Sequence, residues 1–494
     1  MSVIHPWSVR WSGCLTLALM LLVPDVARPG EELEALRTLV RDLEARDAER
    51  GRQLDALRAE LDRLRGQLGS TTGPRGGESP LERALREAGA MPPPEAGPAS
   101  APRAAPPVEL RLIDLSVDVL ASVGSSTVRD DELRGLQAGE HDPSQRGFTL
   151  QQAELSLMGA VDPYLDGEAH LIYFLDTDGE SRFEIEEAFA TTRVLPAGLQ
   201  LEFGQFFTEF GRMNPVHPHA WSWIDQPVVL SRFFGRDGLR QVGARLGWLL
   251  PLPFFSELHL GVQQADGETM VSFLATREVF EERAIGGRPF LDRELQRLDD
   301  LVYLLRWVNG FDVGSEASGQ LGFSGLRGPN ATGPGGWTRV YGTDLVLKWH
   351  PATSRRGWPF LVFESELLVR DYHADAFAGE LQPGSGSTVF LPSETLHDWG
   401  LFAQLLWGPR RPWAGGLRFE LSDGSGSSLG GTGADPFRDR RLRISPLLLL
   451  ELSEFSRARL QYNYDRAEHL RGDQAHTVWL TLEFSLGAHP AHRY

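Results

Sequence analysis

Apolar and polar residues alternate with a period of two from about residue 108 to the end of the chain. The alternation is clearest in "QVGARLGWLL" (residues 241–250) and "RARLQYNY" (residues 457–464). Successive side chains of a strand point to opposite faces, so each such stretch predicts a strand with one apolar and one polar face. The sequence has no apolar run long enough for a membrane-spanning helix.

Apolar alternation bounded by turn residues predicts about 16 strands, so we expect an all-β fold. Glu187 falls on the apolar face of the fourth strand unless a β-bulge shifts the register. The predicted strands lie near residues 110–123, 148–161, 167–176, 183–194, 198–206, 239–250, 256–265, 300–309, 319–327, 338–350, 359–371, 399–408, 413–422, 440–452, 455–465 and 476–487.

The connections between these strands differ in length on the two sides of the sheet. One side has short turns such as "LPAG" and "PRRP", whereas the other has long connections such as 207–238 and 266–299. Outer-membrane barrels have short periplasmic turns, long outer loops and an even number of strands. A soluble β-sandwich has no reason to show this asymmetry, so we predict a transmembrane antiparallel β-barrel over residues 108–494.

Tryptophans also gather at one end of the predicted strands. Their amphipathic rings prefer the membrane interface, so they predict an aromatic girdle on the short-turn side. The residues concerned are Trp248, Trp307, Trp349, Trp358, Trp407 and Trp413.

The first residues resemble an export signal. Arg10, an apolar run from Cys14 to Val23 and the small residue Ala27 predict a signal peptide over residues 1–27, with a retained N-terminal anchor as the alternative. Cys14 is the only cysteine. Its removal would exclude disulfides and thiolate metal sites from the mature chain.

Two further segments precede the predicted barrel. Residues 31–68 place leucines in alternating three- and four-residue steps, which predicts an α-helical coiled coil of roughly 55 Å. The alternative is a lone solvated helix, and the number of associating chains stays open. Residues 69–107 are rich in Pro, Gly and Ala and predict an extended linker.

Charge is unevenly distributed over the polar faces of the strands. The chain carries a net charge of -18 and one lysine, Lys348, so a nucleic-acid partner is not expected. We predict a pore wall with acids on one side and arginines on the other, biasing passage toward anions. The alternative is ordinary solvated wall charge. The predicted wall residues are Glu154, Glu184, Glu186, Glu202, Glu364, Glu366, Arg245, Arg370, Arg418, Arg441, Arg443, Arg457 and Arg459.

The connection over residues 207–238, here called the third outer loop, is too apolar for a freely solvated loop. We expect it to fold into the lumen and narrow the pore, with an outer lid or a contact between protomers as the alternative. Its candidate constriction residues are Glu209, Arg212, Asp225, Arg232, Arg236 and Asp237.

His217 and His219 flank a proline in this loop, and imidazole suits zinc. Two histidines around a proline fix no geometry, and the tail histidines His489 and His492 belong to the opposite side of the predicted membrane. We therefore expect no metal site and no cofactor. The sequence contains no G-x-S-x-G elbow and no H-E-x-x-H helix, so we do not expect an enzyme.

Several segments together resemble the phosphate-selective porin O and P family. They are "FTLQQAELSLMGAVDPYLDGEAHLIY", "GLQLEFGQFFTEFGRMNPVHPHAW", "DGLRQVGARLGWLLP" and the terminal strand. The resemblance covers about residues 108–494 and implies a trimeric 16-stranded porin for passive diffusion in the bacterial outer membrane. Phosphate selectivity in that family depends on lysine-rich and arginine-rich lumen clusters, and this chain has one lysine. The ending "LGAHPAH" resembles outer-membrane proteins described for zinc uptake.

Two other functions stay open at this stage. The chain can be a structural envelope tether, in which a plugged barrel anchors a periplasmic coiled coil that contacts the cell wall, or a metal-uptake protein. The last predicted strand must pair with the first to close the barrel. Tyr494 resembles the terminal aromatic read by barrel-assembly machinery, and we expect "GAHPAHRY" to turn off the strand at the periplasmic rim.

Overall fold

The computed structural model describes residues 113–136, 139–176, 179–380, 386, 388–426 and 435–487. The chain divides into two units, Met1–Pro106 and Pro107–Tyr494, and the described residues all belong to the second. The predicted signal peptide, coiled coil and linker lie outside the described residues, as do residues 488–494 of the tail.

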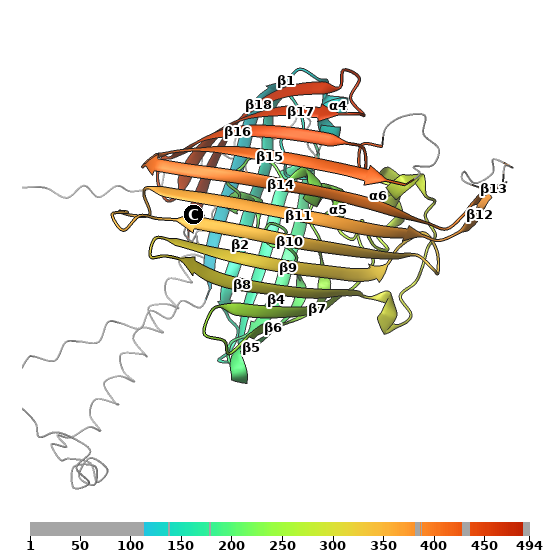
Figure 1. Ribbon diagram of the computed structural model, residues 1–494, viewed down its shortest axis with the longest axis horizontal. Coiled ribbons are helices and arrows are strands. Elements are labelled where there is room, and N and C mark those ends of the chain that lie inside the picture. Colours follow the sequence, from blue (N-terminus) through green and yellow to red (C-terminus); the bar gives the residue numbers. More distant parts are fainter. Residues whose placement is uncertain are drawn as a thin grey trace, which may run out of the picture. The chain divides into compact units, whose positions relative to one another are not determined.

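Sixteen strands form a closed antiparallel barrel in the described part of the chain (Figure 1). Each barrel strand pairs with its neighbours in sequence, which confirms the predicted all-β antiparallel barrel and its number of strands. The strands are β1 (Asp114–Ser126), β2 (Gly147–Ala160), β3 (Leu165–Leu175), β4 (Ser181–Thr192), β5 (Leu199–Phe207), β6 (Arg240–Leu249), β7 (Ser256–Gln263), β8 (Val302–Val313), β9 (Ala317–Pro329), β10 (Trp337–Trp349), β11 (Phe360–Ala374), β14 (Glu394–Arg410), β15 (Trp413–Ser425), β16 (Arg441–Glu451), β17 (Ser456–Ala467) and β18 (Gln474–Gly487).

The last strand closes the barrel against the first. In the antiparallel register of β18 and β1, Leu486 lies opposite Val117 and Leu480 lies opposite Val123. This pairing was predicted from the sequence, and it leaves no open edge in the barrel sheet that the structure describes.

The barrel has an apolar outer face and a polar inner face. On β18 the outward residues Leu480, Leu482 and Phe484 are exposed, whereas the inward residues Thr481 and Glu483 are buried. A barrel in water has the opposite polarity, so this arrangement is the one that a lipid-embedded barrel requires. Among the described residues, no helix is long and apolar enough to cross a membrane.

The predicted tryptophan girdle needs correction at two positions. Trp248, Trp407 and Trp413 are exposed near the short turns, as expected. Trp307 is also exposed but lies in the middle of β8. Trp358 is buried because it belongs to an inward cluster of apolar residues. Its ring packs edge-on against Phe360, with ring centroids 4.7 Å apart.

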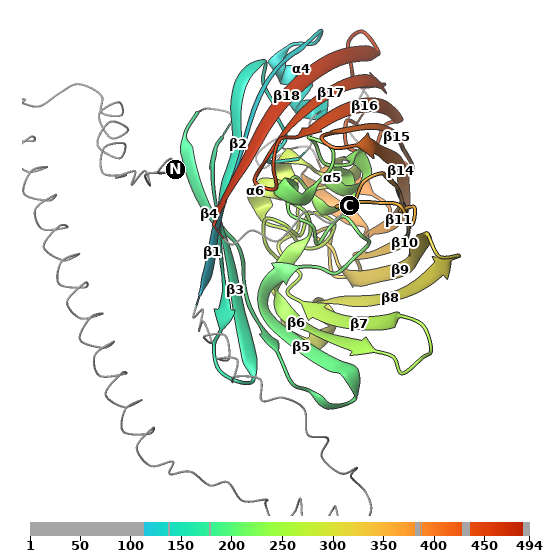
Figure 2. The ribbon, with the colours of Figure 1, turned by 90° about the vertical axis from the view of Figure 1, so that its left-hand side faces the viewer.

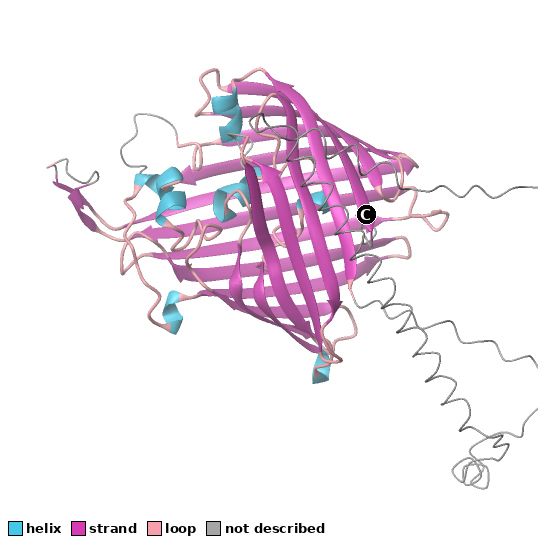
Figure 3. Cartoon of the chain, turned by 180° about the vertical axis from the view of Figure 1, so that it is seen from behind, coloured by secondary structure: helices cyan, strands magenta, loops and turns pink. Residues whose placement is uncertain are grey.

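The connections at one end of the barrel hold most of the short helices (Figure 3). They are α4 (Asp130–Leu136), η2 (Pro218–Ala220), α5 (Val228–Phe234), α6 (Arg277–Glu282), η3 (Ile285–Gly287) and η4 (Leu298–Asp300), whereas η1 (Pro196–Gly198) lies in a short turn. A hairpin of β12 (Phe377–Glu380) and β13 (Thr388–Leu391) extends the connection between β11 and β14.

The largest apolar cluster of the described residues lies inside the barrel. Phe233 and Phe234 of α5 pack with Leu304, Val340 and Leu368, which point inward from β8, β10 and β11. Figure 2 shows α5 within the ring of strands. The interior is therefore partly filled by a segment of the chain itself.

Replacing Leu482 by Arg tests the assignment of the outer face to lipid. Leu482 is 54% exposed and lies well inside β18. An arginine there should destabilise the barrel by about 2–4 kcal/mol in lipid vesicles, because a charge at mid-membrane depth is poorly solvated. Equilibrium urea unfolding measures the loss.

The matched control is His476→Arg, at the loop end of the same strand. Its cost should be about 0–1 kcal/mol, because a charge near the interface reaches water. Equal losses for the two variants would contradict a lipid-facing surface at Leu482.

Candidate functional site

The third outer loop, which joins β5 to β6, lies inside the barrel and not on its outer surface. Phe210, Trp221 and Val229 of the loop are almost fully buried. They belong to the same apolar cluster as inward residues of β9 and β14, such as Leu326 and Phe402. Burial of these side chains accounts for the apolar composition of the loop.

The predicted wall arginines of β15, β16 and β17 all lie inside the barrel and are at most 2% exposed. Their surroundings differ from the expectation of a water-filled lumen, since they contact the third outer loop or, for Arg441, the end of α4. The residues concerned are Arg418, Arg441, Arg443, Arg457 and Arg459.

Asp225 of the loop is the centre of these contacts. Its carboxylate pairs with Arg418 and with Arg443, whose Nη1 lies 2.8 Å from Oδ2. Gln461 and Asn463 of β17 donate further hydrogen bonds to the same carboxylate, at 2.7 and 2.8 Å. Two arginines and two amides thus hold one buried carboxylate, which is how a buried charge avoids a large desolvation cost.

Arg457 and Arg459 bind the loop through its backbone. Both pair with Glu483 of β18, at 2.9 and 2.8 Å. Arg459 also donates to the carbonyl oxygens of Trp221 and Trp223, at 2.9 and 3.1 Å. These carbonyls would otherwise be buried without a donor, so the arginines fix the path of the loop.

The acidic side of the wall holds the first part of the loop. Glu366 of β11 accepts hydrogen bonds from the backbone N–H groups of Arg212 and Met213, at 2.6 and 2.7 Å. The guanidinium of Arg212 pairs with Glu364 at 3.2 Å. The acids and arginines of the wall therefore bind successive parts of one loop.

Arg245 of β6 lies between two acids on this side. It pairs with Glu202 of β5 at 2.8 Å and with Glu209 of the loop at 2.9 Å. Glu209 and Arg212 are 26% and 30% exposed at their side chains, so this part of the interior is more open than the arginine side.

The other predicted residues have separate partners. Arg232 pairs with Asp439 at 2.7 Å, and Arg370 of β11 pairs with Asp398 of β14 at 2.7 Å. Arg236 is exposed, and it does not join the buried arginines.

One carboxylate of β4, Glu184, and one of the third outer loop, Asp237, have other partners. Asp237 contacts His141 and Arg240, and Glu184 also pairs with Arg240. Asp142, in the connection after β1, accepts the backbone N–H of Gln226 at 2.9 Å. Burial and the nearby charge of Asp225 raise the pKa of Asp142 to about 7.

A cavity of about 510 Å³ lies at the short-turn end of β8, β9 and β10. Its lining includes Arg212 of the loop together with Asp312, Gln320 and Lys348 of the wall. The single lysine of the chain, which the sequence analysis did not place at a site, therefore lines this cavity with an arginine beside it.

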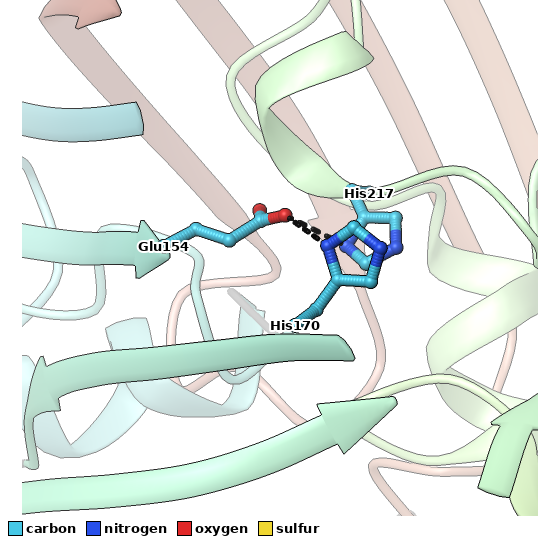
Figure 4. A group of neighbouring side chains, drawn as sticks. All are labelled: Glu154, His170 and His217. Carbon is cyan, nitrogen blue, oxygen red and sulfur yellow. Dashed lines mark hydrogen bonds and ion pairs between the residues drawn. The ribbon is translucent and has the colours of Figure 1, made fainter. Parts of the chain in front are cut away.

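A cluster of histidine and glutamate side chains lies where the loop meets β2, β3 and β4 (Figure 4). His170 Nδ1 is 2.9 Å from Glu154 Oε1, and His217 Nδ1 is 3.4 Å from the same oxygen. The three side chains place one ligand atom each within 4.8 Å of the others. The sequence analysis named Glu154 and His217 but gave His170 no role.

Sequence reasoning missed several residues that complete the interior. Glu483, Asp465, Gln461 and Asn463 lie on the inward faces of β17 and β18, and each contacts a wall arginine or Asp225. Their alternation with lipid-facing residues is the signal that could have revealed them.

No family model matches the chain. A protein of Aquifex aeolicus (strain VF5), described only as uncharacterized, is 31% identical to it over 412 residues, which cover 78% of this chain and 80% of that protein. The chain belongs to the same family as this Aquifex protein. That relationship extends over most of both chains and brings no activity with it.

Three solved structures resemble the barrel at low identity. They are the outer membrane channel DcaP of Acinetobacter baumannii (9% identity, 76% of this chain, 97% of that chain, TM-score 0.46), an anion-selective porin from Comamonas acidovorans (9%, 76%, 99%, TM-score 0.45) and OprB of Pseudomonas putida (9%, 76%, 94%, TM-score 0.44). With identities and TM-scores this low, these likenesses assign no function to the chain.

Replacing Asp225 by Asn should destabilise the protein by about 3–5 kcal/mol, because Arg418 and Arg443 lose a buried countercharge while remaining buried. Urea unfolding in lipid vesicles, followed by tryptophan fluorescence, measures the loss.

The control is Asp176→Asn, which breaks a pair with the exposed Arg182. Exposed pairs contribute little, so its effect should stay below about 1 kcal/mol. A loss for Asp225→Asn as small as that of the control would show that Asp225 does not hold the loop.

Proposed function

We propose that the protein is a porin of the bacterial outer membrane that admits small hydrophilic or ionic solutes by passive diffusion. The observation that carries the proposal is a closed barrel with an apolar outer face, a charged inner face and one long loop folded inside it. A barrel with this polarity encloses a polar route across a lipid bilayer. The predicted signal peptide would export the chain.

The third outer loop would set the width of this route. On the arginine side, the wall and the loop are in contact and nearly fully buried. On the acidic side, Glu209, Arg212 and Glu364 keep 16–30% of their side chains exposed, and the cavity lined by Lys348 adjoins Arg212. Solutes would therefore pass between the loop and strands β6 to β11.

The ion preference would come from the basic groups on this more open side. Arg418 and Arg443 are neutralised by Asp225 together with Glu420 and Asp465, so they contribute little net field to the lumen. Arg212 and Lys348 line the cavity together with Asp312, and Arg212 also pairs with Glu364. The proposed selectivity is accordingly a preference for anions, to which the buried arginines make a smaller electrostatic contribution.

The chain would assemble as a homotrimer in the outer-membrane lipid, with the predicted coiled coil of residues 31–68 in the periplasm, where it could contact the cell wall. Leucine-rich heptads favour association between chains and would add to contacts between barrels.

Single-channel recording of the purified protein in planar bilayers tests the transport function. The wild type should show small, reproducible conductance steps, because the loop fills much of the lumen. Asp225→Ala should raise the step size, since it frees the loop from Arg418 and Arg443. No conductance in either protein would contradict the proposal.

A structural envelope tether is the second candidate, and burial of the loop against the wall favours it. The apolar cluster formed by α5, Val340, Leu368 and Phe402 occupies the outer part of the interior like a plug. A tether would show no conductance steps in planar bilayers, even after the Asp225→Ala replacement. A metal-uptake protein would instead conduct divalent cations in preference to anions.

Reversal potentials in a KCl gradient test the anion bias. Arg212→Gln and Lys348→Gln should each move the reversal potential toward cation preference, because each removes a positive charge from the cavity wall. Arg277→Gln, in an exposed outer connection, is the control and should leave it unchanged. Unchanged potentials in both lumen variants would contradict the selectivity.

A further inference from the structure

The histidine and glutamate cluster is built from four separate elements. Glu154 comes from β2, His170 from β3, Glu186 from β4 and His217 from the third outer loop. Glu154 and Glu186 are at most 1% exposed, and His170 and His217 are nearly buried. The elements meet only in the folded barrel.

The facing atoms of the cluster converge on one point, and two of the three spacings are shorter than those between zinc ligands, so the side chains would separate slightly to take up an ion. His217 Nδ1 lies 2.8 Å from Glu186 Oε2 and 3.4 Å from Glu154 Oε1, and His170 Nδ1 lies 2.9 Å from the same Glu154 oxygen. Ligands about 2.0–2.1 Å from a tetrahedral zinc are about 3.3 Å apart. His217 Nδ1 and Glu186 Oε2 form an ion pair, and His170 Nδ1 also lies 2.9 Å from Ser156 Oγ, so a bound cation would take the place of a proton between the facing atoms.

The outer nitrogen of each ring is held by a carboxylate. His170 Nε2 lies 2.8 Å from Glu168, and His217 Nε2 lies 2.8 Å from Glu187. A carboxylate that accepts from Nε2–H orients each ring so that Nδ1 faces the centre of the cluster, where loss of the Nδ1 proton would give a lone pair to a metal ion. Histidines that bind metals have this kind of support from a second residue.

A β-bulge in β4 supplies the acids. The register of β3 and β4 shifts between His170 and Leu171, so His170 pairs with Glu187 while Leu171 pairs with Ile185. The unpaired residue is Glu186, and both glutamates point inward instead of one facing lipid. The bulge that the sequence analysis required for Glu187 thus places two carboxylates beside His217.

We propose that this cluster binds one divalent transition-metal ion, with zinc best suited to the ligand set. His170 Nδ1, His217 Nδ1 and Glu154 Oε1 would be the ligands, and Glu186 Oε2 the fourth. The cluster contains more carboxylates than imidazoles. A bound dication would therefore offset the excess negative charge of the cluster. The groups concerned are Glu154, Glu168, Glu186, Glu187, His170, His217 and His219.

The ion would fasten the third outer loop to the wall. His217 is the ligand from the loop, and the other three come from β2, β3 and β4. Asp225 already holds the far part of the loop to β15 and β16, so the metal would add a second anchor on a separate part of the wall. This role does not depend on the transport function, because it concerns the position of the loop alone.

Isothermal titration of the full-length protein in detergent with Zn²⁺, after chelation of bound metal, tests the site. The wild type should bind one equivalent per chain. His217→Ala should weaken this binding by at least about tenfold, because a metal ligand is lost. His259→Ala, a buried lumen histidine beside Arg245, is the matched control and should bind as the wild type does.

Two further variants separate metal binding from misfolding. Glu168→Gln keeps the shape of a side chain that supports a ligand, and it should weaken Zn²⁺ binding by about 10–100-fold. The barrel of this variant should remain folded, as judged by heat-modifiable migration in gels. Co²⁺ in place of Zn²⁺ should give the strong visible absorption of a tetrahedral site in the wild type and not in folded His170→Gln.

His489 and His492 of the tail are another source of imidazole, so the titration is repeated in the His489→Ala/His492→Ala variant. Retained binding there supports the lumen site. Loss of binding in the tail variant, with full binding in His217→Ala, would overturn the proposal. Absence of Zn²⁺ binding by the wild type would overturn it as well and leave the cluster as a network of protonated histidines and glutamates.

Discussion

Charged groups on the inner wall of the barrel need partners, and the third outer loop supplies them. The clearest case is Asp225, which sits between Arg418 and Arg443 and also accepts from Gln461 and Asn463. Without the loop, Arg418 and Arg443 would keep Glu420 and Asp465 as partners but would lose the countercharge of Asp225. Without the wall, the loop would leave its own carbonyls and carboxylate unsatisfied.

The same contacts have opposite consequences on the two sides of the lumen. On the arginine side they bury the charges and remove most of their long-range field. On the acidic side, Arg212 and Arg245 pair with glutamates that keep part of their surface in water. A route for ions and its selectivity are therefore decided by the residues that the loop leaves exposed, and the number of arginines on the wall is a poor guide to either.

Most of the fold could be predicted because lipid and lumen impose a strict period of two. Val478 to Leu486 shows the alternation without interruption, and β18 pairs with β1 as that pattern requires. The candidate site was less predictable. His170 gave no local signal, and Trp358 was assigned to the membrane interface although an inward apolar cluster buries it.

The sequence by itself determined the number of strands, their order, which face of each meets lipid, and which loop is too apolar to remain in water. These follow from the side-chain period of a strand and from the solvation of apolar groups. Only the tertiary structure decided that Asp225 lies between two arginines and that His170, His217 and Glu154 share one centre. The pairing of β2 with β3 brings Glu154 to His170, and the folding of the third outer loop into the barrel brings His217 and Asp225 to the wall.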